Sequence, residues 1–180
     1  MRHVTLVVLV TGALLMSGCA ASTKHIPSVE GFDQARYAGK WYEIIRLPHW
    51  FEEGLSHVTA EYTINPDGTI QVVNRGYDAE SGEWEVARAK ARLAGPEDRG
   101  ELKVTFFWPF SGAYRIIELD HADYQYAVVT GDTMEYFWIL SRSPVMEESL
   151  LDSLLDRARV WGFDLTQMIR VDQTSHVPEP

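Results

Sequence analysis

Residues 57–77, HVTAEYTINPDGTIQVVNRGY, give the clearest indication of the fold. From Val58 to Ile64 apolar and polar residues alternate, which is the period of a strand with one buried face. Residues 65–68 (Asn-Pro-Asp-Gly) then predict a turn, because Pro fixes one backbone dihedral and Gly permits a positive φ. Residues 70–77 form the return strand, so the stretch predicts an antiparallel hairpin.

The same pattern continues on both sides of this hairpin. Apolar-rich runs separated by turn signals predict further strands, which brings the total to eight, at residues 41–47, 84–93, 102–108, 113–119, 124–130 and 136–142. Eight antiparallel strands with short connections predict an all-β, up-and-down barrel, and a two-sheet sandwich is the alternative.

The period changes after the eighth strand. Ser143 and Pro144 are typical of a helix start, and apolar residues recur at three and four up to Trp161. Gly162 suits the C-terminal end of a helix. We therefore expect a C-terminal helix at about 144–161 packed on the side of the barrel, with one short strand between residues 163 and 171.

Strand parity predicts which side chains face the interior. Tyr62 belongs to the apolar set of alternating residues on its strand. Phe106 likewise belongs to the apolar set on the strand at 102–108, whose other set is polar. The last strand is apolar on both parities, with Trp138 on one face and Phe137 on the other. Such a strand makes sense if one face lines the interior and the other lies under the helix. Parity alone leaves open whether the interior is filled or hollow.

The first 18 residues are typical of a signal peptide, with a basic start, a short apolar run and small residues before the cut. A buried N-terminal strand or helix is the alternative. Residues 15–19 (Leu-Met-Ser-Gly-Cys) resemble the bacterial lipobox, in which the Cys is acylated, with chains such as palmitate, and anchors the protein. An ordinary signal cut that leaves Cys19 as a free thiol is the alternative. We expect a flexible tether at residues 19–29, a folded domain at 30–172 and a disordered tail at 173–180.

Composition excludes several classes of function. The formal net charge is −10, which repels phosphates, so no nucleic acid is expected as a partner. A single Cys forbids an internal disulfide, and the six His residues form no ligand-spaced pair for a metal. The sequence contains no G-x-S-x-G elbow. We expect no cofactor, no metal site and no catalytic residue.

Three motifs carry a resemblance to a known family. Residues 39–44 (Gly-Lys-Trp-Tyr-Glu-Ile) lie on the first predicted strand, residues 123–129 (Asp-Tyr-Gln-Tyr-Ala-Val-Val) precede and enter the seventh, and Ser141-Arg142 ends the eighth. In this order and position they resemble the three motifs of lipocalins, and bacterial lipocalins in particular. The resemblance implies an eight-stranded barrel open at one end. It also implies that Gly39, Trp41 and Arg142 close the base, with the Arg packed across the indole.

The resemblance further implies a function. It points to an outer-membrane lipoprotein of a Gram-negative bacterium, lipid-anchored on the periplasmic face. Such a protein stores or transports fatty acids or lysophospholipids for membrane biogenesis or repair, and it forms a homodimer. The alternatives are an envelope interaction protein with a filled barrel and a lipid-modifying enzyme.

Five aromatic residues are candidate ligand contacts, because apolar walls with a few hydroxyls suit an acyl chain with a polar end. They are Tyr62, Phe106, Tyr114, Tyr136 and Trp138. The alternative for each is simple core packing. Glu43 is expected to point inward and to need a basic partner, with Arg88 and Arg115 among the candidates, or else to lie at a solvated rim.

Overall fold

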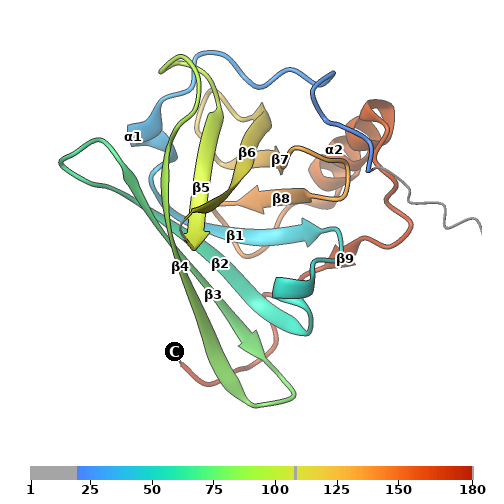
Figure 1. Cartoon of the computed structure of the whole chain (residues 1–180). Coiled ribbons are helices and arrows are strands. Elements are labelled where there is room, and N and C mark those ends of the chain that lie inside the picture. The colour runs from blue at the N-terminus through green and yellow to red at the C-terminus, as the bar shows by residue number, and fades with distance from the viewer. Residues whose placement is uncertain (1–19, 108, 180) are drawn as a thin grey trace, which may run out of the picture.

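The structure is a computed structural model that describes residues 20–107 and 109–179, and it confirms the predicted barrel. The strands are β1 (Gly39–Arg46), β2 (Leu55–Ile64), β3 (Ile70–Asp78), β4 (Glu83–Leu93), β5 (Glu101–Phe107), β6 (Phe110–Leu119), β7 (Tyr126–Thr130), β8 (Phe137–Ser141) and β9 (Ile169–Arg170). The helical elements are α1 (Gln34–Tyr37), η1 (Trp50–Glu52) and α2 (Glu148–Trp161). Neighbouring strands are antiparallel, and β1 pairs with both β8 and β2, which closes the sheet on itself (Figure 1).

The two ends of the barrel differ. Because successive strands run in opposite directions, the connections 47–54, 79–82 and 131–136 lie at one end, which we call the mouth. The opposite end, the base, holds α1 and the start of β1. At the base the guanidinium carbon of Arg142 lies 3.9 Å from the centroid of the Trp41 ring.

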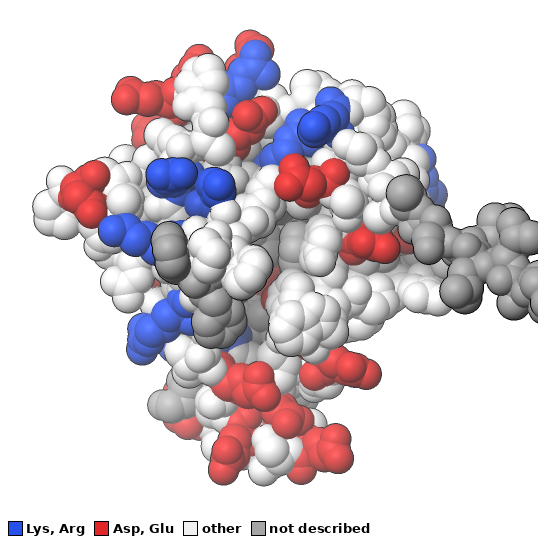
Figure 2. All heavy atoms as spheres, viewed as in Figure 1, with Lys and Arg blue, Asp and Glu red and all other residues white. Residues whose placement is uncertain are grey.

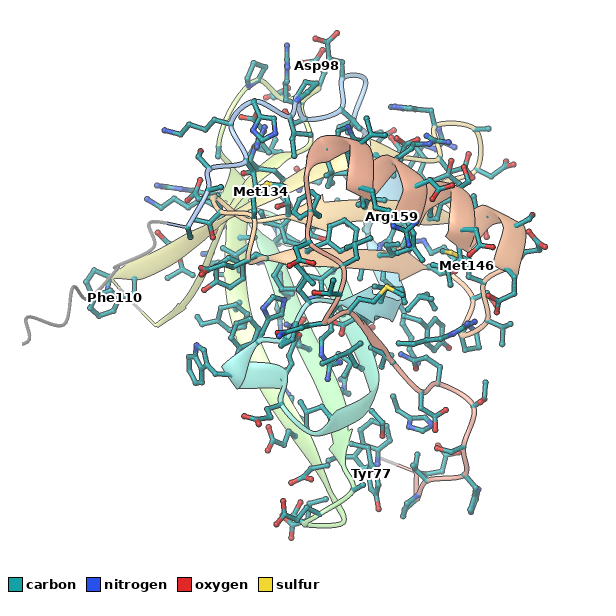
Figure 3. The ribbon with its side chains drawn as sticks, turned by 90° about the vertical axis from the view of Figure 1, so that its right-hand side faces the viewer. Tyr77, Asp98, Phe110, Met134, Met146 and Arg159 are labelled. Carbon is teal, nitrogen blue, oxygen red and sulfur yellow. The ribbon has the colours of Figure 1, made fainter. Side chains whose placement is uncertain are left out.

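Two hydrophobic clusters follow the predicted strand parity. One fills the interior near the base and includes Trp41, Tyr62 and Leu102. The other lies between the barrel wall and α2, and it contains both Phe137 and Ile139 from the outer face of β8. The two-sided apolar character of β8 is therefore explained as predicted. In Figure 3 α2, with Arg159 labelled on it, lies across the strands of this wall.

The predicted helix start was wrong. The helix begins at Glu148 and not near Pro144, and the carboxylate of Glu147 caps it by accepting a hydrogen bond from the Leu150 N–H at 3.0 Å. The preceding residues carry the chain from the base to the barrel side, where Met146 is buried under the helix. The C-terminal end is as expected, since Gly162 adopts φ 96°. The short strand expected between residues 163 and 171 is β9, which pairs with β1.

The segments on either side of the barrel are packed against it. Thr23 and Ile26 are buried, and Arg115 donates hydrogen bonds to both of their carbonyls, so the described part of the expected tether covers the barrel wall. The expected disordered tail also makes contacts. Gln173 Nε2 donates to the carbonyls of Glu43 and Val58, each at 2.8 Å. These partners are distant in sequence, so local composition could not reveal them. Across residues 20–107 and 109–179 there is no helix of the length and apolarity needed to span a bilayer.

Candidate functional site

The barrel encloses a cavity of about 330 Å³ that reaches the mouth. Its apolar wall comes from strands far apart in sequence and includes Val58, Ala60, Val72, Val104 and Leu140. The small residues Gly112 and Ala113 leave space on β6. The face of the molecule drawn in Figure 2 is hollowed near its centre. A mostly apolar cavity of this size matches the usual form of a small-molecule site.

All five predicted contact residues lie at this cavity, namely Tyr62, Phe106, Tyr114, Tyr136 and Trp138. Their burial differs, because Tyr62 is nearly inaccessible whereas Phe106 is exposed. The barrel thus brings together side chains from β2, β5, β6, β8 and the connection before β8. Contact with a ligand remains a prediction for each of them.

Three tyrosine hydroxyls form a cluster toward the base. The Tyr62 hydroxyl donates to the Tyr114 hydroxyl at 2.9 Å, and the Tyr114 and Tyr37 hydroxyls lie 2.6 Å apart. Burial raises the pKa of Tyr37 and of Tyr114 well above the usual tyrosine value. These hydroxyls are therefore neutral, and Tyr62 and Tyr114 present them at the deep end of the cavity.

A second polar group, Glu43 and Glu52, lies on the cavity wall nearer the mouth. Glu43 is 4% exposed and accepts a hydrogen bond from Arg46 Nη1 at 2.9 Å. Glu52, on η1, accepts a hydrogen bond from Trp138 Nε1 at 3.2 Å. Burial raises the pKa of Glu43 well above its usual value, and the nearby Glu52 charge adds to this effect. Burial also raises the pKa of Glu52.

The partner of Glu43 differs from the candidates named from sequence. Glu43 pairs with Arg46, three residues along the same strand, and neither Arg88 nor Arg115 provides the charge. Side chains at i and i+3 of a regular strand point to opposite faces, but a register shift between Glu43 and Ile45 alters this parity. A bulge of this kind leaves no clear sequence signal, which is why the pair was missed.

His49 supports the loop above this wall. It is 6% exposed and stacks on Phe51 and Tyr136, with ring centroids 5.2 Å apart in both cases. Burial, assisted by the charge of Arg46, lowers the pKa of His49 to about 4. A neutral imidazole at this position keeps the loop packed without adding a charge beside the cavity.

The mouth widens toward one side. β4 pairs with β5 only from Lys90 to Leu93, so the N-terminal half of β4 leaves the barrel with β3 as a projecting hairpin (Figure 1). Ala87 pairs with the cavity-lining Asn74 in the register of β3 and β4, but this splay leaves Ala87 exposed. Aromatic side chains are also exposed at this end, among them Trp50 at 83% and Phe110 at 78%. Phe110 projects from the molecule in Figure 3.

Gly39, Trp41 and Arg142 lie together at the base. Gly39 adopts φ 96°, and a Cβ there would lie 3.3 Å from Arg142 Nη1. Trp41 is fully buried, and its indole N–H donates to the Tyr37 carbonyl at 2.8 Å. The cavity therefore has one closed end. The remaining predicted site residue, Cys19, lies outside the described residues.

Comparisons with known proteins agree with this geometry. A family model described as a lipocalin-like domain matches residues 32–173. The chain is 45% identical over 165 residues to an outer membrane lipoprotein Blc of Vibrio cholerae, covering 92% of this chain and 96% of the relative. It is 41% identical over 175 residues to Blc of Escherichia coli K12, covering 96% and 98%. The structure of insecticyanin from the tobacco hornworm Manduca sexta superposes with a TM-score of 0.67 at 22% identity, over 82% of this chain and 84% of that one.

Proposed function

Because this chain belongs to the lipocalin family, we propose that it is a lipid-binding outer-membrane lipoprotein that stores or transports fatty acids or lysophospholipids for membrane upkeep. One observation carries the proposal, which is the apolar cavity of about 330 Å³ with a closed base and an open mouth. A closed base and an open mouth suit a single acyl chain that enters end-on and leaves its polar end near the mouth.

The wall chemistry supports a flexible apolar ligand. Valine, alanine and leucine side chains dominate the middle of the cavity, and burying each methylene of a ligand against them contributes about 0.8 kcal/mol. Polar groups concentrate at the hydroxyl cluster of Tyr62 and Tyr114 and at the wall formed by Glu43 and Glu52. We propose that the five predicted aromatic residues contact this ligand.

Filling the cavity tests the proposal directly. Ala60 lines the cavity on β2, so Ala60→Phe should occupy ligand volume and weaken binding of a fluorescent fatty acid at least tenfold. Ala94→Phe is the matched control, because Ala94 is exposed between β4 and β5 at the base, and its substitution should leave affinity unchanged. Equal affinities for the two variants and the parent would contradict a ligand site inside the barrel.

The names of the relatives support the proposed location. Both Blc relatives are outer membrane lipoproteins, which favours an outer-membrane location for this chain. We propose that Cys19 carries the lipid and that the protein faces the periplasm. Cys19→Ala should move the protein from the membrane fraction to the soluble fraction. Retention of the variant in the membrane fraction would contradict acylation of Cys19.

Self-association is a further part of the proposal. The exposed rings of Trp50 and Phe110 give the mouth an apolar surface that a second copy of the chain would cover. Analytical ultracentrifugation should find a dimer that Trp50→Ser with Phe110→Ser weakens. A monomer at all concentrations would contradict the dimer without affecting the carrier role.

A further inference from the structure

The charged groups that line the cavity all have the same sign. Glu43, Glu52 and Asp132 lie on its wall, and among the described lining residues none is Lys, Arg or His. A carboxylate ligand would therefore meet negative charge with no lining cation to pair with it. Because like charges repel strongly in a partly buried site, this wall disfavours an anionic head group.

The nearby guanidinium binds protein groups through both Nη atoms, whereas its buried Nε has no hydrogen-bond partner within the described residues. Arg46 is 1% exposed, and its Nη1 donates to Glu43 Oε1. Its Nη2 donates to the carbonyls of Glu52 and Leu55, at 2.7 and 3.0 Å. These bonds fix the 47–54 loop, so Arg46 cannot turn to a ligand without releasing it. One guanidinium thus faces two carboxyl groups.

A further acceptor faces the same space. Asn74, on β3, lines the cavity, and its buried Oδ1 has no hydrogen-bond partner within the described chain. A buried acceptor without a partner costs free energy until a donor reaches it. The wall therefore offers carboxylate and amide oxygens together, and such a set fits a group that donates hydrogen bonds and carries positive charge.

We propose that the wall formed by Glu43, Glu52 and Asn74 binds the ammonium end of a single-chain amphiphile, in preference to a carboxylate end. This inference rests on the proposed function and narrows it, because among the proposed ligands it favours lysophospholipids with an amine in the head group over free fatty acids. An ammonium group has three N–H donors and one positive charge, which match three acceptors and one excess negative charge.

The charge balance predicts a proton exchange. With two carboxyl groups beside one guanidinium, we expect Glu43 and Glu52 to share one proton in the absence of ligand, and burial raises the pKa of both groups. The groups that act on the pair are Arg46 on β1, Tyr62 on β2 and the Trp138 indole on β8, and His49, which packs against Trp138, is neutral at pH 7. A bound ammonium replaces that proton, so one proton leaves to solvent for each amine bound.

Matched ligands test the head-group preference. Decylamine, decanoate and 1-decanol share a chain length and differ only in the head, and at pH 7 the amine is protonated. Competition against a fluorescent probe should show that the amine binds the full-length protein at least tenfold more tightly than the carboxylate, with the alcohol between them. The same competition compares lysophosphatidylethanolamine with lysophosphatidylglycerol of equal chain length. Tighter binding of the ethanolamine lipid would identify a lipid headgroup as the source of the ammonium, and equal binding of the two lipids would identify a simple amine.

Variants locate the preference on this wall. Glu52→Gln and Glu43→Gln should each reduce the ratio of amine to carboxylate affinity at least fivefold. Glu53→Gln is the matched control, because Glu53 follows Glu52 in the same loop but is exposed and does not line the cavity, and its ratio of amine to carboxylate affinity should change less than twofold. A ratio that is unchanged in both Gln variants would overturn the assignment.

Proton release gives a measurement that needs no variant. Calorimetric titrations of decylamine in two buffers of different ionisation enthalpy should show about one proton released per amine bound, and close to none for 1-decanol. Carboxylate binding as tight as amine binding, or amine binding without proton release, would overturn the inference and leave the carrier function intact. Failure of all three ligands to bind would instead contradict the proposed function.

Discussion

Arg142 stacks on Trp41 with its guanidinium carbon 3.9 Å from the indole centroid, and it also acts as a hydrogen-bonding hub for the base. Its nitrogens donate to backbone carbonyls in and around α1, at the start of β1 and before β7, namely those of Arg36, Tyr37, Ala38, Lys40 and Tyr124. Arg142, directly after β8, therefore binds both residues 36–40 and Tyr124, which are distant from it and from each other in sequence.

Replacing Arg142 should weaken the whole base. Arg142→Ala removes the stacked cation and leaves several carbonyls without a donor, so we expect a loss of about 3 kcal/mol in the free energy of unfolding. Arg142→Lys keeps the charge but not the planar fork, and it should lose about 2 kcal/mol. Urea unfolding measures both, and Arg92→Ala on the exposed face of β4 is the control. Equal stability of the Lys variant and the parent would refute the role of the fork.

Gly39 should tolerate no side chain. Its φ of 96° is unfavourable for an L-residue, and a new Cβ would press on Arg142 Nη1 at 3.3 Å. Gly39→Ala should therefore cost about 2 kcal/mol in thermal or urea unfolding. At Gly112 a Cβ would meet nothing within 4 Å, so Gly112→Ala is the matched control and should change stability by less than about 0.5 kcal/mol.

The tyrosine cluster predicts that two Tyr→Phe variants differ in their loss of stability. Tyr114→Phe removes the hydroxyl that lies within hydrogen-bond distance of both Tyr62 and Tyr37, leaving two buried hydroxyls without this partner. It should destabilise the protein by about 2 kcal/mol, whereas Tyr62→Phe removes a single bond and should cost about 1 kcal/mol. If denaturant unfolding gave the reverse order, the central position of Tyr114 would be wrong.

His49 predicts a pH dependence of stability. Its pKa is lowered to about 4 in the folded protein from 6.5, so between these values the unfolded chain binds the proton more readily. The stabilising contribution is complete above pH 6.5 and is lost as the pH falls through 4. Between pH 7 and pH 4 the free energy of unfolding of His49→Gln should fall by about 2 kcal/mol less than that of the parent, after allowance for solvent screening. Unfolding of both proteins at pH 7 and pH 4 measures the difference, and parallel pH profiles would contradict the assignment.

Strand alternation explains why the fold was predictable from sequence. Residues 57–77 predicted a hairpin, and the register of β2 against β3 pairs Ala60 with Asn74 and Tyr62 with Val72 on the inner face. The two-sided apolar pattern of β8 predicted the cover by α2. These features depend on period and local turn chemistry, which a single sequence carries.

The parts that escaped prediction depend on long-range contacts. The pairing of Glu43 with Arg46 requires a bulge in β1, and the position of Glu52 on the cavity wall requires the 47–54 loop to fold inward. The packing of residues 20–29 depends on Arg115, which lies far along the chain. Composition predicts a tether for such a segment, because nothing local reveals the partner that buries it.

Native lipid extraction tests directly whether the barrel carries an amphiphilic ligand. The protein is purified without denaturant or added lipid, and its organic extract is analysed by mass spectrometry beside an extract of the Ala60→Phe variant. We predict single-chain amphiphiles in the parent extract and their depletion in the variant. An empty parent protein whose tryptophan fluorescence ignores added decylamine, fatty acid and lysophospholipid would contradict it.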